Sequence, residues 1–189
     1  MSSDISDAVL EGDAYEHAAA LTRRVFPISL TGKIRLSAVV LASTALLAPA
    51  ISVRRELIAE LDPAAGGTPP AFVAVAALGA GITFLFGLAF LRQRHVVQTR
   101  DLDFETAKRL IRLEDLLMTF TVSTGLLFVL APVALAVLGA LSPDAVLYLY
   151  QQDVRLYRPA GGSLLTAGRV SAGGLVLTGV LLVVDAVTR

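Results

Sequence analysis

The chain has 189 residues, of which 55% are hydrophobic and only 17% are charged, and its mean hydropathy is +0.71. A soluble globular domain usually holds about 45–50% apolar and about 25% charged residues, so this apolar surplus favours a lipid environment. The formal net charge is zero, which gives no support for nucleic-acid binding. The absence of cysteine excludes disulfides, thiolate metal sites and cysteine nucleophiles.

Arginine supplies nearly all of the basic residues, since Lys33 and Lys108 are the only lysines, and alanine, valine, leucine and glycine are abundant. This composition is typical of a GC-rich genome, and we expect a prokaryotic source. Tryptophan is absent, so an aromatic belt at the membrane surface has to consist of tyrosine and phenylalanine.

The N-terminal segment, residues 1–33, is too polar to cross a membrane. Its acidic and polar start differs from the basic opening of a secretory signal. Ile5, Val9, Leu21 and Val25 fall near one face of a helix, with acidic residues early and arginines late, which suits the helix dipole. We expect a cytoplasmic amphipathic segment that lies on the membrane surface or against the bundle; docking to a partner is the alternative.

Four stretches are long and apolar enough to cross a hydrocarbon core about 30 Å thick, which takes about 20 residues. They are residues 36–53, 71–91, 116–141 and 164–184. A helix of a soluble bundle carries a polar face, whereas residues 71–91 contain one hydroxyl group and no charge. The sequence therefore predicts an all-α membrane protein whose domain, residues 34–189, is a four-transmembrane-helix bundle.

The distribution of the sixteen basic residues predicts the orientation, because basic residues gather on the cytoplasmic side. With a cytoplasmic N-terminus, eleven lie inside: Arg23, Arg24, Lys33, Arg35, Arg92, Arg94, Arg100, Lys108, Arg109, Arg112 and Arg189. Five lie outside: Arg54, Arg55, Arg155, Arg158 and Arg169. We predict a multi-pass protein of the cell membrane with both termini in the cytoplasm, although Arg54 and Arg55 run against the trend.

The two longer loops differ in character. In the inner loop, residues 92–115, Asp101 or Asp103 can cap a helix, so we expect cytoplasmic helical extensions of spans two and three. In the outer loop, residues 142–162, Ser142 precedes a proline, which is typical of a helix start. A short helix lying flat on the outer surface fits the rest of this loop, and so does a small hairpin.

Arg169 is the one candidate for a functional intramembrane charge. It lies five residues into the fourth predicted span, which places it about 7–8 Å below the outer boundary at 1.5 Å rise per residue. Its side chain can reach back to the interface. Alternatively it faces the bundle and pairs with Asp153 or with hydroxyl groups of a neighbouring span. We expect Asp185 only to end the fourth span.

Small residues spaced by four mark faces where helices can approach closely. The candidate helix-packing residues are Gly79, Thr83 and Gly87 in the second span, and Gly168, Ala172, Gly174 and Thr178 in the fourth. Such a face suits a helix of the same chain, a second copy or another membrane protein.

The sequence contains no motif for a catalytic group, a cofactor or a metal ion. We therefore expect a non-enzymatic accessory, scaffold or regulatory subunit of a membrane assembly, in contact with the lipid bilayer and with a second copy or a membrane-protein partner. The alternative is a small oligomeric channel or carrier, because hydroxyl residues cluster in the third span and Pro49 and Pro132 can kink their helices. An enzyme acting on lipid would have to use His95 with Asp101 or Asp103.

Overall fold

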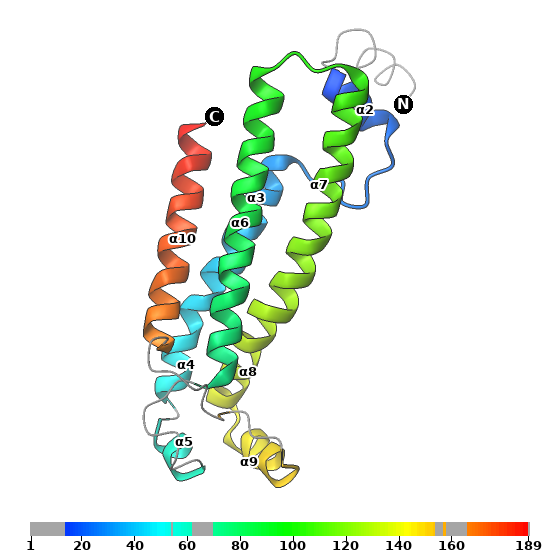
Figure 1. Cartoon of the computed structure of the whole chain (residues 1–189). Coiled ribbons are helices and arrows are strands. Elements are labelled where there is room, and N and C mark those ends of the chain that lie inside the picture. The colour runs from blue at the N-terminus through cyan, green and yellow to red at the C-terminus, as the bar shows by residue number, and fades with distance from the viewer. Residues whose placement is uncertain (1–13, 54, 62–69, 154–156, 158–165, 189) are drawn as a thin grey trace.

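The computed structural model describes residues 14–53, 55–61, 70–153, 157 and 166–188, and contains no strand within them (Figure 1). The described elements are α2 (Ala14–Leu21), α3 (Leu30–Ser43), η1 (Thr44–Leu46), α4 (Leu47–Val53), α5 (Arg55–Leu61), α6 (Ala71–Thr99), α7 (Phe104–Thr124), η3 (Gly125–Leu130), α8 (Ala131–Leu141), α9 (Pro143–Gln151) and α10 (Ala167–Val187). Here η1 is a 3-10 turn and η3 is a π-helical segment.

Four of the described helical stretches are long and apolar enough to cross a membrane, which confirms the predicted number of spans. The first, Leu30–Val53, combines α3, η1 and α4; the third, Phe104–Leu141, combines α7, η3 and α8. The second and fourth are α6 and α10. The chain is therefore an all-helical, multi-pass membrane protein.

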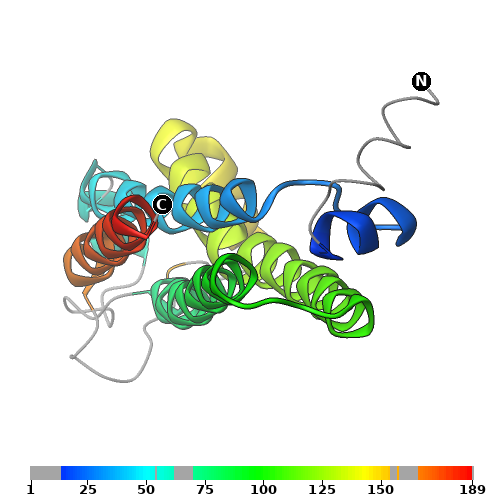
Figure 2. The same cartoon turned by 90° about the horizontal axis from the view of Figure 1, so that it is seen from above.

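The bundle has two distinct ends (Figure 1). The end that holds α2, the α6–α7 connection and the last turn of α10 is called the terminal end below, and the end that holds α5 and α9 is called the distal end. Viewed along the bundle, α10 lies at one edge, and α2 lies at the opposite edge beside α7 (Figure 2). The two termini of the described chain thus emerge at one end of the molecule.

The helices that flank the α6–α7 connection reach past the other spans. The 21 residues of α10 extend about 31 Å at 1.5 Å per residue, close to one hydrocarbon thickness, whereas the 29 residues of α6 extend about 43 Å. The additional turns lie at the terminal end, beyond the last turn of α10 (Figure 1). The helices of spans two and three continue without a break in this region.

Side-chain caps fix the start of α7 and of α9. The Asp103 carboxylate accepts a hydrogen bond from the Thr106 N–H at 3.3 Å. Hydrogen bonding to the Thr106 side chain, and then to this N–H, holds the pKa of Asp103 below its ordinary value. The Ser142 hydroxyl accepts from the Ala145 N–H at 3.4 Å and Pro143 follows it, so the predicted helix start in the outer loop is confirmed. The alternative hairpin falls largely on residues outside the described ranges.

Both prolines that the sequence marked as kink sites lie beside irregular helix. Pro49 follows the 3-10 turn η1, and Pro132 follows the π-helical segment η3. A proline lacks the N–H that an α-helix donates to the carbonyl four residues earlier, and for Pro132 that carbonyl belongs to Phe128. The backbone of α6 approaches Phe128 closely at Gly79. A Cβ added at Gly79 would lie 2.6 Å from the Phe128 Cβ and 2.7 Å from its carbonyl oxygen.

Apolar side chains fill the interior in two main clusters. Near the distal end, Leu47, Val73, Ala136 and Tyr157 belong to one buried group. The other, nearer the terminal end, contains Ile34, Ala38, Leu41, Ala80, Phe90, Leu91, Met118 and Leu181. Van der Waals packing of these side chains and close backbone contact hold the spans together, because lipid tails are as apolar as the side chains and burial alone gives no hydrophobic gain.

We expect Gly79→Val to destabilise the protein, because its side chain must displace the Phe128 backbone. Overpacking of this kind costs about 1–3 kcal/mol. Gly81→Val is the matched control, since a Cβ at Gly81 meets no described atom within 4 Å. Thermal unfolding in detergent, followed by circular dichroism, measures both variants. Equal melting temperatures for the two would contradict this contact.

Candidate functional site

A buried ion pair joins the first and third spans at the terminal end. Lys33 lies in the first turn of α3, which Ser29 caps, and Glu114 lies in α7. The Lys33 Nζ is 2.5 Å from the Glu114 Oε1, and the two side chains are 0% and 2% exposed. A charge removed from water is tolerated when an opposite charge and hydrogen bonds compensate it, so this pair fixes α3 against α7.

The N-terminal segment completes this cluster. The Tyr15 hydroxyl, from α2, donates to the Glu114 Oε2, and the Val25 N–H donates to the Asp115 Oδ2 at 2.9 Å. Burial raises the pKa of Tyr15 well above its ordinary value, and the bond to Glu114 raises it further. The Arg24 guanidinium lies 5.7 Å from the centre of the Tyr15 ring, within range of a cation–π contact.

Apolar contacts hold α2 in the same place. Ala18 is fully buried against Ala107 and Ile111 of α7, and the His17 ring meets the Phe104 ring edge-on. Within the described residues, α2 therefore packs against the bundle. Ile5 and Val9, which the predicted amphipathic face includes, lie outside the described residues, so that face stays a prediction. Docking of the N-terminal segment to a partner stays a prediction.

A second buried ion pair joins the second and fourth spans. The Arg94 guanidinium, from α6, donates to the carboxylate of Asp185 in α10, and also donates to the Asp185 carbonyl at 3.0 Å and to the Thr188 hydroxyl at 2.9 Å. The expectation that Asp185 only ends the span is therefore wrong. Its carboxylate is the acceptor that lets an arginine lie buried between two helices.

Both pairs lie toward the terminal end of the bundle. Lys33 is in the first turn of α3 and Asp185 is in the last turn of α10, so both lie near an end of a span. Since α10 is about one hydrocarbon thickness long, a bilayer whose thickness matches α10 would have its boundary between lipid tails and headgroups at this level. We call Lys33, Glu114, Arg94 and Asp185 the terminal polar layer.

Sequence reasoning missed this layer for a specific reason. Arg94 and Lys33 fit the positive-inside pattern as basic residues of the cytoplasmic side, and all four charged groups lie just beyond the limits of the predicted spans. The signal was present: acidic residues, Glu114 and Asp185, lie at the same ends of other spans as these basic residues. Opposite charges at matching ends of neighbouring spans are candidates for pairing.

Arg169 lies nearer the distal boundary than the sequence suggested. The helix α10 begins at Ala167 with Thr166 as its cap, so Arg169 is in the first turn and its side chain is exposed. Its N–H donates to the Thr166 hydroxyl at 3.2 Å. The structure does not bring Arg169 to the terminal polar layer, and its functional role stays a prediction.

The candidate packing residues divide into two sets. Gly79, Thr83 and Gly87 all lie buried on one face of α6, and a Cβ at Gly87 would lie 2.9 Å from the Leu181 side chain. On α10, Gly174 is buried against Thr44 and Leu41, and the Thr178 hydroxyl donates to the Gly174 carbonyl. Gly168 and Ala172 are exposed on the opposite side of α10.

Thr83 differs from other hydroxyl residues of the spans in its hydrogen bonding. The hydroxyls of Ser37, Thr121 and Thr178 donate to the carbonyl four residues earlier, as is common in membrane helices. The Thr83 hydroxyl is fully buried and makes no hydrogen bond with a described residue. One turn away, Gly79 packs on the π-helical segment.

The described side chains include no group of three histidine, cysteine, aspartate or glutamate residues that could hold a metal ion. No protein-family model, curated protein or solved structure matches this chain significantly. The functional argument therefore depends on the residues and their geometry.

We expect Glu114→Gln to lower the stability of the protein by about 3–5 kcal/mol, because it leaves the Lys33 ammonium buried opposite a neutral amide. Asp115, 3.9 Å from the Lys33 Nζ, compensates this charge only in part. Glu105→Gln, at an exposed position of the same helix, is the matched control. Unfolding in detergent measures both. The double variant Lys33→Met/Glu114→Gln should recover much of the loss, and a single variant as stable as the control would contradict the pairing.

Proposed function

We propose that the chain is a non-enzymatic accessory, scaffold or regulatory subunit of a membrane assembly, and that α10 is the helix through which it associates. The observation that carries this proposal is the outward face of α10. The proposal concerns a protein of the cell membrane whose terminal end lies in the cytoplasm.

Small residues on the outward face of α10 support a helix–helix contact. Gly168, Ala172 and Gly179 are exposed and fall on one side of this helix, opposite the buried Gly174. A Cβ at Gly179 meets no described atom within 4 Å, whereas Gly174 is in close contact with α3. Of the four spans, α10 is also the least buried and lies at the edge of the bundle (Figure 2). Small residues on such a face let a second helix approach closely.

The use of the buried charges also supports a structural role. Lys33 pairs with Glu114 and Arg94 pairs with Asp185, and each pair connects two spans. Charged groups that serve chemistry or transport usually face a substrate or an aqueous path. Here the four charged groups form two separate ion pairs, which suits a subunit with a structural role better than one with a catalytic role.

The charge distribution supports a cytoplasmic terminal end. Among the described residues, the exposed basic residues at this end are Arg23, Arg35, Arg92, Arg100, Arg109 and Arg112, against Arg55 and Arg169 at the distal end. Arg54, Arg155, Arg158 and Arg189 lie outside the described residues, and the eleven-to-five count over the whole sequence has the same sign. Since basic residues gather on the cytoplasmic side, under this proposal the turns of α6 and α7 that reach past the other spans lie in the cytoplasm. They would then be the cytoplasmic extensions that the sequence predicted.

A channel or carrier is the second candidate, and the buried Thr83 hydroxyl beside the π-helical segment is the observation that favours it. Irregular backbone and unpaired polar groups at membrane depth are typical of ion paths. Solute flux into liposomes that contain the purified protein, abolished by Thr83→Val, would favour this function over a structural one.

We expect single cysteines at the outward face of α10 to form cross-links in native membranes. The chain has no cysteine of its own, so Ala172→Cys and Gly179→Cys each introduce a unique thiol. Leu127→Cys is the matched control, because Leu127 is exposed on the third span. A bifunctional maleimide followed by mass measurement distinguishes a second copy from another protein. Only monomer at both α10 positions, or equal cross-linking at position 127, would contradict association through α10.

A further inference from the structure

The connection between α2 and α3, together with the last residue of α2, forms a strap of residues 21–29 at the terminal end. Both of its ends are fixed. At one end the Thr22 N–H donates to the Ala18 carbonyl, and at the other the Ser29 hydroxyl caps α3. In its middle the Val25 N–H is bound to the Asp115 carboxylate of α7. The strap therefore has a defined orientation on the bundle.

This orientation places apolar side chains outward. Leu21 is 63% exposed, Val25 is 71% exposed and Ile28 is 39% exposed, whereas Phe26 packs against the buried cluster of the terminal end. The hydrogen bond of Val25 uses its backbone N–H and leaves its side chain exposed. The strap is fixed on the bundle and exposes three apolar side chains, and such exposed apolar groups mark a surface that contacts lipid or another protein.

The depth of the strap favours lipid. Asp115, which binds the strap, follows Glu114 directly, and Glu114 belongs to the terminal polar layer. In a bilayer whose thickness matches α10, that layer lies at the boundary between lipid tails and headgroups. Apolar side chains at this boundary can insert among the lipids, as those of interfacial helices do.

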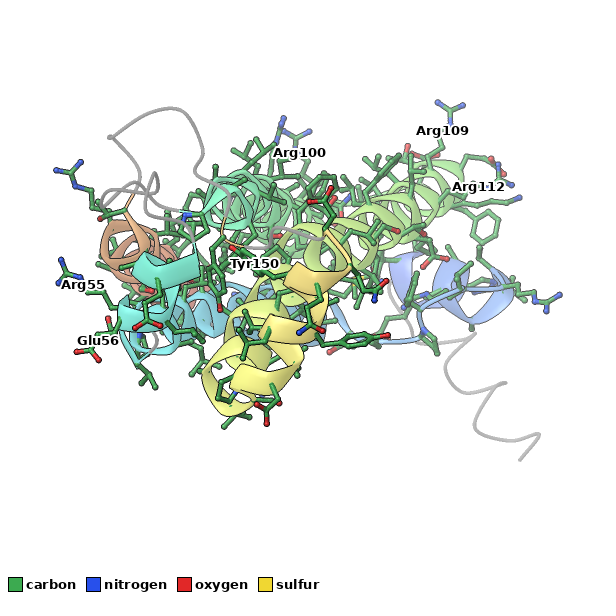
Figure 3. The ribbon with its side chains drawn as sticks, turned by 90° about the horizontal axis from the view of Figure 1, so that it is seen from below. Arg55, Glu56, Arg100, Arg109, Arg112 and Tyr150 are labelled. Carbon is green, nitrogen blue, oxygen red and sulfur yellow. The ribbon has the colours of Figure 1, made fainter. Side chains whose placement is uncertain are left out.

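Two exposed basic residues lie in the strap and in the helix that follows it. Arg23 is exposed within it, and Arg35 is exposed one turn into α3. On α7, Arg109 extends away from the bundle on the side opposite α2, so it lies apart from the strap (Figure 3). Guanidinium groups bind phosphate by paired hydrogen bonds, and basic groups near a membrane surface attract anionic lipids.

We propose that the strap is a binding surface for anionic phospholipid, with Leu21, Val25 and Ile28 among the acyl chains and with Arg23 and Arg35 on the headgroup phosphate. This inference depends on the position of the chain in the bilayer and not on association through α10. The bonds of Tyr15 and Val25 to Glu114 and Asp115 act as positioning contacts that hold the strap at the required depth.

The absence of tryptophan allows a direct test. The variant Val25→Trp is reconstituted in liposomes of phosphatidylcholine and phosphatidylglycerol, and quenching is compared when one or the other lipid carries bromine. We expect blue-shifted emission and at least twofold stronger quenching by the brominated phosphatidylglycerol. Adding Arg23→Gln and Arg35→Gln should make the two lipids equal.

Two further positions control the experiment. Val39→Trp, exposed in the middle of α3, should be quenched equally by both lipids, and Thr99→Trp, exposed at the α6–α7 connection, should emit as a water-exposed residue. Emission of Val25→Trp like that of Thr99→Trp would overturn the proposal. Blue-shifted emission without quenching would also overturn it, because a protein would then cover the strap, and so would equal quenching by the two lipids.

Discussion

A charge that leaves water inside a small helical bundle has to meet an opposite charge, and the terminal end of this protein is built around that requirement. Lys33 meets Glu114, and Arg94 meets Asp185. Each pair connects spans that are not consecutive in the chain, first to third and second to fourth. The four helices are thereby held in register at one end, while apolar side chains and close glycine contacts hold them elsewhere.

The same requirement determines the position of the N-terminal segment. A carboxylate has more acceptor capacity than one ammonium group satisfies. The second oxygen of Glu114 accepts from Tyr15, and Asp115 accepts from the backbone of Val25. The strap and α2 are therefore part of the bundle, although the segment is too polar to span a membrane. The exposed apolar side chains of the strap follow from this placement.

The association proposed for α10 has a different physical origin. Inside the bundle, Gly174 is required because Thr44 and Leu41 occupy the space that a side chain would need. Gly179 faces outward, and a Cβ added there would contact no described atom within 4 Å. No contact within the described chain explains a glycine at position 179. Close approach of another helix in the bilayer would explain it, because a side chain at this position would keep the two backbones apart.

The four spans could be predicted from sequence because length and apolarity alone define them. The helix start at Ser142 and a cap by Asp101 or Asp103 were likewise predictable, since both depend on neighbouring residues, and the structure uses Asp103. The ion pairs were not, because Lys33 and Glu114 are 81 residues apart and only the packing of the helices shows that they meet. The positive-inside rule alone accounts for a basic residue at position 94, so the sequence offered no separate reason to expect the ion pair with Asp185.

A double-mutant cycle on Arg94 and Asp185, followed by unfolding in detergent, tests most directly whether charge pairing holds the terminal end together. The variants are Arg94→Met, Asp185→Asn and the combination of both. We expect each single variant to lose about 3–5 kcal/mol of stability and the double variant to lose less than either, so that the coupling energy exceeds each single loss. Losses that simply add, with no coupling between the two positions, would contradict this account.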